Sequence, residues 1–291
     1  MKGRFAKEES TFVWQVILVW TIVFVLLAAL ILVSIYMIGE MFTGSASNIN
    51  QQEEQKKGQI VVPEVCPAKL SKYSAEDFSY DGAYLACTVS PYERGVDVSH
   101  YQGEIDWQQV RDAGFTFAII RIGGRGYGED GRLYEDESAQ RNYEGAKAVG
   151  MKVGAYFFSQ AITEIEAREE ARFALHLVES WELDLPLVYD WEHISEEART
   201  GSMVEADKIR FTKAFCQIVE NEGIQPMVYV APWASVDYML AVEQYPIWLV
   251  LYSDQMTFKY HFDYWQYSCT GEVPGIEGDV DINLYIPSEE E

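Results

Sequence analysis

Basic residues are scarce in this chain of 291 residues. It contains 22 lysines and arginines against 46 aspartates and glutamates, which gives a formal net charge of −24 at pH 7. A nucleic-acid-binding surface neutralises phosphates with clustered lysine and arginine, so this balance argues against nucleic acid as a partner. It also argues against adsorption of the acidic domain to anionic lipid.

Cysteine and histidine are also rare, with four of each, and no Cys-x-x-Cys pair or Cys/His cluster has metal-ligand spacing. We therefore expect no metal and no other cofactor. Cys216 falls on the apolar face of a predicted helix, so we expect it to be a buried thiol. Cys66 and Cys87 lie in a segment that precedes the main domain. They form either a disulfide, if that segment is extracellular, or two free thiols.

Glycine-rich phosphate-binding motifs are missing. Neither Gly-x-Gly-x-x-Gly nor Gly-x-x-x-x-Gly-Lys-Ser/Thr follows the first predicted strand, so nothing favours a nucleotide-binding function. Aromatic residues, in contrast, are plentiful, with 19 tyrosines and 8 tryptophans. Surplus aromatic rings on a polar domain are typical of a carbohydrate cleft, although most single rings simply pack in the core.

One long apolar run lies near the start of the chain. Residues 12–38 contain no charged residue, and at about 1.5 Å per residue they can cross a hydrocarbon core of about 30 Å. A cleaved signal peptide is the alternative, but its apolar region is typically shorter. Lys2, Arg4 and Lys7 precede the run. The positive-inside rule therefore predicts a single-pass anchor in the cell membrane, with residues 1–11 in the cytoplasm.

Two regions of different composition follow the apolar run. Residues 39–93 are predicted to be an extracellular tether and lead-in segment, because their first part is rich in Ser, Asn and Gln and has little to bury. The second part of this segment contains Pro63, Pro67 and Pro91. Residues 94–291 are predicted to form one folded extracellular domain.

Within residues 94–291, apolar strand-like runs alternate with amphipathic or polar helical runs. Helices are expected between the first six strands, among them 163–181 and 203–223. Eight strands are expected, at 95–99, 115–123, 152–159, 185–192, 226–231, 247–253, 262–268 and 279–286. This alternation predicts an α/β fold with a TIM-like (β/α)8 barrel, irregular at its last two strands. A doubly wound open sheet is the alternative.

Acidic residues stand at several strand ends. Asp190 and Glu192 end the fourth strand, Asp97 lies near the end of the first, and Asp281 lies within the last. Side chains two apart on a strand share a face, so Asp190 and Glu192 should both point into the barrel mouth, where such barrels have their active sites. Two adjacent carboxyls cannot both ionise cheaply, so one keeps a proton and the other stays charged. Glycoside hydrolysis requires this division; a structural pair or a metal site is the alternative.

Five motifs, in the same order, resemble the family 25 glycoside hydrolases, the Chalaropsis-type lysozymes. They are GVDVSHYQGEIDW from residue 95, FAIIRIGGRGYG from 117, EDESAQRNYEGAKAVGMKVGAYFFS from 135, YDWEH from 189 and DYWQYSCTGEVPGIEGDVDIN from 263. The resemblance covers the whole predicted barrel. Residues 248–255, WLVLYSDQ, lack the basic residue often found in the corresponding strand of the family. This departure leaves the acids intact and affects the expected substrate contacts.

The resemblance implies roles for particular residues. Glu192 matches the family's general acid and Asp190 its partner carboxylate, while Asp97 and Asp281 match two further acids of the cleft. Four residues lie in strands that line the family's cleft and are expected to bind substrate: Tyr156, Tyr229, Trp265 and Gln266.

The implied function is that of a membrane-anchored peptidoglycan hydrolase. It would bind glycan strands and cleave the β-1,4 bond between N-acetylmuramic acid and N-acetylglucosamine, with two-carboxylate acid catalysis. Either a carboxylate or the substrate's own acetamido group would attack the sugar. Two alternatives are a catalytically weak glycan-binding or scaffold protein with the same barrel, and a chitinase-like hydrolase. The Asp-x-x-Asp-x-Asp-x-Glu run of chitinases is absent from LDLPLVYDWE.

Overall fold

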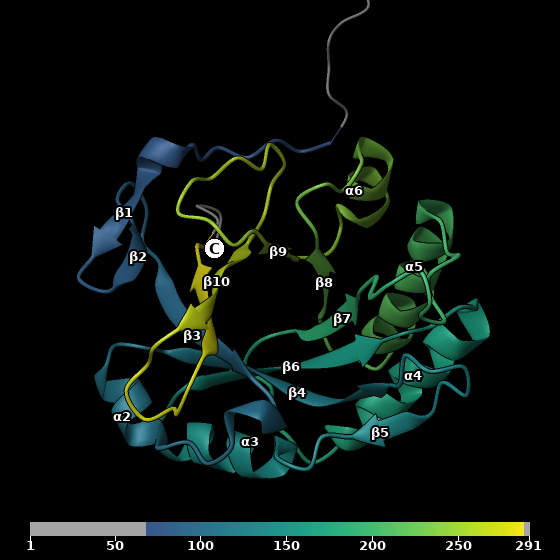
Figure 1. The fold of residues 1–291 in the computed structure, drawn as a ribbon, viewed down its shortest axis with the longest axis horizontal. Coiled ribbons are helices and arrows are strands. Elements are labelled where there is room, and N and C mark those ends of the chain that lie inside the picture. The colour runs from purple at the N-terminus through teal and green to yellow at the C-terminus, as the bar shows by residue number, and fades with distance from the viewer. Residues whose placement is uncertain (1–67, 288–291) are drawn as a thin grey trace, which may run out of the picture. The chain divides into compact units, whose positions relative to one another are not determined.

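The computed structural model describes residues 68–287 (Figure 1). The predicted cytoplasmic N-terminus, the anchor at 12–38, most of the tether and Cys66 lie outside these residues. Within the described part of the chain, no helix is long and apolar enough to cross a bilayer. The membrane anchor therefore stays a prediction.

One sheet closes on itself to form an eight-stranded barrel. Its strand order is β3-β11-β10-β9-β8-β7-β6-β4, and β3 also pairs with β4 to complete the ring, while β5 adds to the edge of β4. The strands are β3 (Glu93–Val98), β4 (Phe117–Arg125), β5 (Leu133–Glu135), β6 (Lys152–Ser159), β7 (Leu187–Trp191), β8 (Pro226–Val230), β9 (Ile247–Val250), β10 (Tyr264–Gly271) and β11 (Val280–Tyr285). Of the barrel strands, β11 runs antiparallel to both of its neighbours. The predicted barrel, irregular at its last two strands, is confirmed.

The helices lie around the outside of the barrel (Figure 1). They are α2 (Trp107–Asp112), α3 (Ala139–Ala148), α4 (Glu164–Leu177), α5 (Glu205–Asn221) and α6 (Val236–Val242). Helix α4 begins after Thr163, whose hydroxyl accepts a hydrogen bond from the backbone N–H of Glu166. Ala167, Ala171 and Ala174 recur on one face of α4 and are fully buried. This helical spacing packs the face against the sheet.

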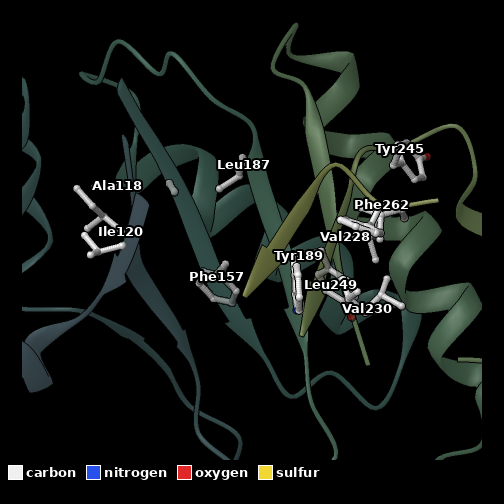
Figure 2. Close-up of a cluster of buried hydrophobic side chains, with 14 of the residues drawn as sticks. Ala118, Ile120, Phe157, Leu187, Tyr189, Val228, Val230, Tyr245, Leu249 and Phe262 are labelled. Atoms are coloured by element: carbon white, nitrogen blue, oxygen red, sulfur yellow. The ribbon is translucent and has the colours of Figure 1, made fainter. Parts of the chain in front are cut away.

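The core has an inner and an outer layer, because alternate side chains of each strand face opposite sides of the sheet. On β4, Phe117 and Ile119 pack inside the barrel, whereas Ala118 and Ile120 pack against the helices. Figure 2 shows part of the outer layer, in which Tyr189 of β7 also lies. The same alternation determines which side chains at the end of β7 point into the barrel and which point toward the helices.

The end of the lead-in segment is folded. Strands β1 (Phe78–Asp81) and β2 (Tyr84–Cys87) form an antiparallel hairpin, which belongs to the same compact unit as the barrel. The Phe78 ring packs edge-on against Trp265 with a centroid distance of 4.9 Å. Cys87 and Cys216 are buried, and neither forms a disulfide with another cysteine of the described residues. Because Cys66 lies outside the described residues, its pairing with Cys87 stays a prediction.

A substitution at Gly95 tests the packing of the inner layer. It pairs with Phe117 across β3 and β4, and a Cβ atom at Gly95 would overlap the Phe117 ring. Gly95→Ala should therefore destabilise the fold by about 1–3 kcal/mol, measured as a lower urea midpoint. In the control Gly128→Ala, the new Cβ would meet its nearest atom, Asp130 Oδ1, at 3.7 Å, so its midpoint should match that of the wild type. An unchanged midpoint for Gly95→Ala would contradict the packing described here.

Candidate active site

Four acids gather inside one end of the barrel. Asp97 lies next to the last residue of β3, Asp190 lies near the end of β7, and Glu192 follows that strand. Asp281 faces Asp97 directly, because the two residues are paired across β3 and β11. The charge of Asp97 acts on each of the other three acids. The structure therefore brings together all four acids that the sequence singled out.

Asp97 and Asp281 form the first carboxyl pair, joined by a hydrogen bond. Burial, followed by the charge of Asp97, raises the pKa of Asp281 to about 9. Burial also raises the pKa of Asp97, but hydrogen bonds from Asn283, Gln266 and Asp281 oppose that increase. At neutral pH, Asp281 therefore holds the proton and donates it to a charged Asp97.

Two buried amides hold Asp97 in this state. Gln266 Nε2 and Asn283 Nδ2 each lie 2.8 Å from Asp97 Oδ2. Trp248 Nε1 donates to Asn283 Oδ1 at 2.8 Å, and the Tyr229 hydroxyl donates to Gln266 Oε1 at 2.6 Å. These donors occupy the amide oxygens, so the NH2 groups must point at Asp97.

Asp190 and Glu192 form the second carboxyl pair, also joined by a hydrogen bond. Burial raises the pKa of Asp190 well above its usual value, and the charge of Glu192 raises it further. Burial also raises the pKa of Glu192, against the effect of its hydrogen bond with Asp190. The two groups titrate as a unit with one proton between them. Asp190 is buried whereas Glu192 is only half-buried, so a substrate can reach the proton through Glu192.

A lysine lies close behind the second pair. Lys208, in the first turn of α5, places its ammonium 5.2 Å from the ring centroid of Trp191 and 5.0 Å from that of Tyr238. Both contacts are of the cation–π type. Burial lowers the pKa of Lys208 to about 8. While it is charged, this lysine lowers the pKa of Asp190 and Glu192, which opposes the larger effect of burial on both acids.

The backbone at Glu192 is fixed by a buried amide. Gln160 Nε2 donates to the carbonyl oxygens of Ser159 at 2.9 Å and Glu192 at 2.7 Å. The Thr200 hydroxyl donates to Gln160 Oε1 at 3.1 Å. Gln160 and Thr200 are both fully buried. Gln160, directly after β6, is therefore hydrogen-bonded to the segment that follows β7 through both ends of its amide: the NH2 group contacts Glu192 and the oxygen contacts Thr200.

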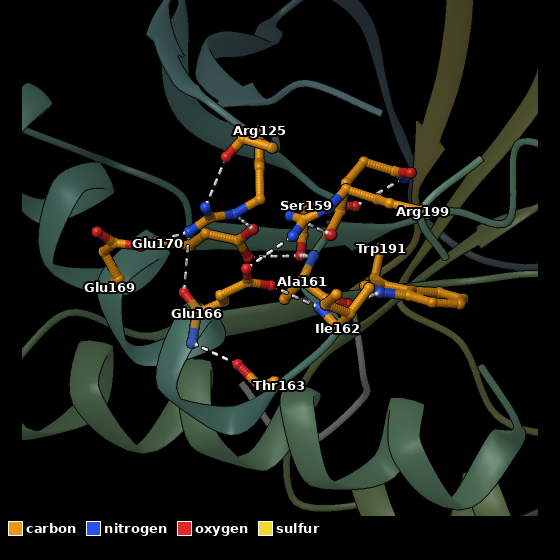
Figure 3. Close-up of polar contacts among 12 residues, drawn as sticks. Arg125, Ser159, Ala161, Ile162, Thr163, Glu166, Glu169, Glu170, Trp191 and Arg199 are labelled. Carbon is orange, nitrogen blue, oxygen red and sulfur yellow. Dashed lines mark hydrogen bonds and ion pairs between the residues drawn. The ribbon is translucent and has the colours of Figure 1, made fainter. Parts of the chain in front are cut away.

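Arginines extend this connection (Figure 3). Arg199 donates to the carbonyl oxygen of Gln160 at 3.1 Å and to Glu166 Oε1 at 2.7 Å. Arg125 Nε lies 2.7 Å from Glu170 Oε1, and burial raises the pKa of Glu170 to about 7. These contacts join the loops after β6 and β7 to helix α4. Glu192 thus projects from a part of the barrel rim that hydrogen bonds and ion pairs connect to helix α4.

The residues expected to bind substrate divide into two groups. The side chains of Tyr156, Tyr229 and Gln266 all face the interior of the barrel. Tyr156 and Tyr229 belong to the inner layer, and Gln266 contacts Asp97. Their contact with sugar stays a prediction. Trp265, in contrast, is fully buried in the outer layer, and its Nε1 donates to the carbonyl oxygen of Leu251. Trp265 therefore does not line the cleft, because adjacent residues of a strand face opposite sides.

The two histidines nearest the mouth have carboxylate partners. His100 Nδ1 lies 3.2 Å from Asp136 Oδ2, and His193 Nε2 lies 3.5 Å from Glu196 Oε1. Within residues 68–287, no group of three or more His, Cys, Asp or Glu side chains is arranged to hold a metal ion. Metal-independent chemistry stays a prediction.

The barrel and its paired carboxyls define the class of protein as a barrel glycoside hydrolase. The model of the glycosyl hydrolases family 25 matches residues 96–276. Lysozyme M1 of Streptomyces globisporus is 30% identical over 216 residues, which cover 68% of this chain and 71% of that protein. The chain belongs to glycosyl hydrolase family 25 and is a lysozyme-type glycoside hydrolase.

Solved structures share the fold. The bacterial lysozyme from Streptomyces coelicolor is 26% identical with a TM-score of 0.53, over 68% of this chain and 93% of that chain. The modular autolysin LytC from Streptococcus pneumoniae, solved in complex with a synthetic peptidoglycan ligand, is 20% identical with a TM-score of 0.55. That match covers 67% of this chain and 46% of LytC, so this chain corresponds to less than half of the autolysin.

The proton on Asp281 predicts how stability depends on pH. The unfolded chain ionises Asp281 near its usual pKa of 3.8, whereas the folded protein keeps the proton up to about pH 9. Between these values unfolding releases a proton, so rising pH lowers the free energy of unfolding. Asp281→Asn removes this effect and should reduce the slope by up to about 1.4 kcal/mol per pH unit.

Urea titrations at several pH values between 4 and 9 measure this slope. The exposed neighbour Asp279 provides the matched control, since Asp279→Asn should keep the wild-type slope. The same slope for Asp281→Asn and the wild type would mean that Asp281 is ionised in the folded protein.

Proposed function

We propose that this protein is a membrane-anchored N-acetylmuramidase. It cleaves the β-1,4 bond between N-acetylmuramic acid and N-acetylglucosamine in peptidoglycan. The observation that carries the proposal is the half-buried Glu192, which shares a proton with buried Asp190 opposite a charged Asp97. The similarity to lysozyme M1 supports the choice of substrate.

Glu192 supplies the proton. It transfers the proton of the second pair to the glycosidic oxygen as the bond from that oxygen to the anomeric carbon breaks. Burial favours this transfer, because it raises the pKa of Glu192 and so keeps a proton available. A water molecule later adds its hydroxide to the anomeric carbon, and its proton restores the Asp190–Glu192 pair.

Negative charge on Asp97 stabilises the positive charge that develops on the sugar. The two amide donors and Asp281 keep this carboxylate ionised and fixed in position. Preorganised charge of this kind costs no rearrangement at the moment of reaction. Within the described residues, Asp190 Oδ1 is buried without a hydrogen-bond partner. It can accept a hydrogen bond from the bound sugar.

Glu192→Gln tests the proton donor. The amide keeps the size of the side chain but cannot donate an acidic proton, so the rate should fall at least about 100-fold with no loss of melting temperature. The measurement is release of reducing ends from purified peptidoglycan by residues 63–291. Mass spectrometry then identifies the reducing-end sugar, which should be N-acetylmuramic acid.

Glu196→Gln is the matched control, because the Glu196 side chain is 83% exposed and follows the same strand. It should release products at the wild-type rate. Wild-type release by Glu192→Gln would remove Glu192 from the role of acid. N-acetylglucosamine at the new reducing end would contradict the proposed bond specificity.

The membrane anchor is the second part of the proposal. The charge-free run at 12–38 follows Lys2, Arg4 and Lys7, so the barrel should face outward. Protease added to intact spheroplasts should release a soluble barrel fragment that begins between residues 41 and 93, while a cytoplasmic marker protein stays intact. If the barrel resists cleavage until the cells are lysed, the proposed orientation is wrong.

A further inference from the structure

Two neighbouring barrel strands, β9 and β10, are not followed by helices in the described part of the chain. Residues 251–263 connect β9 to β10, and residues 272–279 connect β10 to β11. Trp265 and Tyr267 of β10 nevertheless have exposed fractions of only 0% and 5%. Another part of the chain therefore covers these outward-facing rings.

The folded end of the lead-in segment, residues 68–92, provides this cover. Phe78 of β1 packs edge-on against Trp265, with 4.9 Å between the ring centroids. The backbone N–H of Leu85 donates to the Tyr267 hydroxyl at 3.3 Å. Phe78 and Leu85 are themselves only 7% and 1% exposed, so this segment is packed like the core of the domain and not like a linker.

The lead-in segment is also joined by its backbone to the loop before β10 (Figure 1). Leu70 forms an antiparallel β-bridge with Tyr260. The backbone N–H of His261 donates to the carbonyl oxygen of Lys69 at 2.9 Å. These contacts belong to this chain's own lead-in segment, which precedes the residues 96–276 that match the family model.

Trp265 connects the covered face to the loop after β9. Its Nε1 donates to the carbonyl oxygen of Leu251 at 2.8 Å, and the backbone N–H of Leu251 donates to the carbonyl oxygen of Gln266 at 3.0 Å. Tyr252 is the next residue, and its hydroxyl donates to Gln266 Oε1 at 3.2 Å. A displaced Trp265 would therefore move Leu251, and with it the hydroxyl that holds the Gln266 amide.

The Gln266 amide links this path to the acids. Its Nε2 donates to Asp97 Oδ2 at 2.8 Å. This hydrogen bond lowers the pKa of Asp97, against the larger effect of burial. A Gln266 amide that is held less firmly would form a weaker bond, so Asp97 would take up a proton at a higher pH.

Other ionisable groups face Asp97 from the strands around it. On β4 the charged residue is Arg121, which is paired with Asp136. The others are three acids and three tyrosines: Asp281 of β11, Asp190 and Glu192 at the end of β7, Tyr156 of β6, Tyr229 of β8 and Tyr252 after β9. Substitutions in the lead-in segment change none of these groups. A shift that they cause therefore reports how well Gln266 holds Asp97.

We propose that the lead-in segment, residues 68–92, is a positioning element of the active site: Phe78 supports Trp265, and Trp265 keeps the Gln266 amide against Asp97. The segment is then part of the catalytic domain as well as its connection to the anchor. Phe78 and Trp265 are positioning residues, because they act on Asp97 through Gln266. The proposal rests on the proposed function, in which a charged Asp97 takes part in cleavage.

Phe78→Ala in the full chain, solubilised in detergent, tests the support of Trp265. Because Asp97 should then be protonated at a higher pH, the acid limb of kcat/KM on soluble peptidoglycan oligomers should move up by about 0.5–1 pH unit. Below the wild-type midpoint, kcat/KM should be about 3- to 10-fold lower, and at higher pH it should stay within about two-fold of the wild type. Trp265→Phe, which keeps a ring but loses the N–H donor to Leu251, should shift the limb in the same direction.

A double variant separates positioning from stability. Gln266→Met removes the amide donor and should move the acid limb upward by itself. Adding Phe78→Ala to Gln266→Met should lower the melting temperature further but should not move the limb again, because the contact through which Phe78 acts is already lost.

Tyr84→Ala is the matched control, because Tyr84 lies on the other strand of the same hairpin and its ring packs against Phe115 at 5.0 Å. It should lower the melting temperature but keep the wild-type acid limb. The proposal is overturned if Phe78→Ala keeps the wild-type limb, if Tyr84→Ala shifts it equally, or if the shifts of Phe78→Ala and Gln266→Met add. Failure of the proposed function would appear differently, as absence of cleavage by the wild type at every pH.

Discussion

The hydrogen bond between the carboxyls of Asp281 and Asp97 is the contact on which the barrel mouth depends. These residues face each other across β3 and β11, and β11 completes the ring between β3 and β10. Two ionised carboxylates at this position would repel each other in a poorly hydrated place. The barrel therefore closes with a proton retained at its seam. The same proton leaves Asp97 as the charged member, so closure of the fold and preparation of the site have one physical origin.

Much of the fold could be predicted from the sequence because its strands are buried on both faces. Strand β6 has the predicted bounds of 152–159. An apolar run of that length between polar helical segments is typical of a buried strand and too short for a buried helix. Strand β5 and the β1–β2 hairpin were not predicted. They contain only three or four residues each. Such short strands show no recognisable alternation of apolar and polar residues, and they form because of the strands with which they pair.

The site was predictable where it follows from alternation along a strand. Asp190 lies inside and Trp191 outside, as a period of two requires, whereas expecting both Trp265 and Gln266 in the cleft ignored that same rule. The lysine whose charge acts on the second carboxyl pair, and the residues that hold the backbone at Glu192, could not be found in this way. Lys208, Gln160 and Arg199 act through loops and helices that only the closed barrel brings to β7.

The protons held at the mouth change how strongly the mouth is repelled by a charged polymer. The formal charge of −24 counts every carboxyl as ionised. Each carboxyl pair, however, retains a proton at neutral pH, and Glu170 behind the rim has a pKa of about 7. The mouth is therefore closer to neutral than its composition implies, while the rest of the surface keeps its charge. Protonation of these groups therefore lowers the repulsion between the acids of the mouth and an anionic polymer.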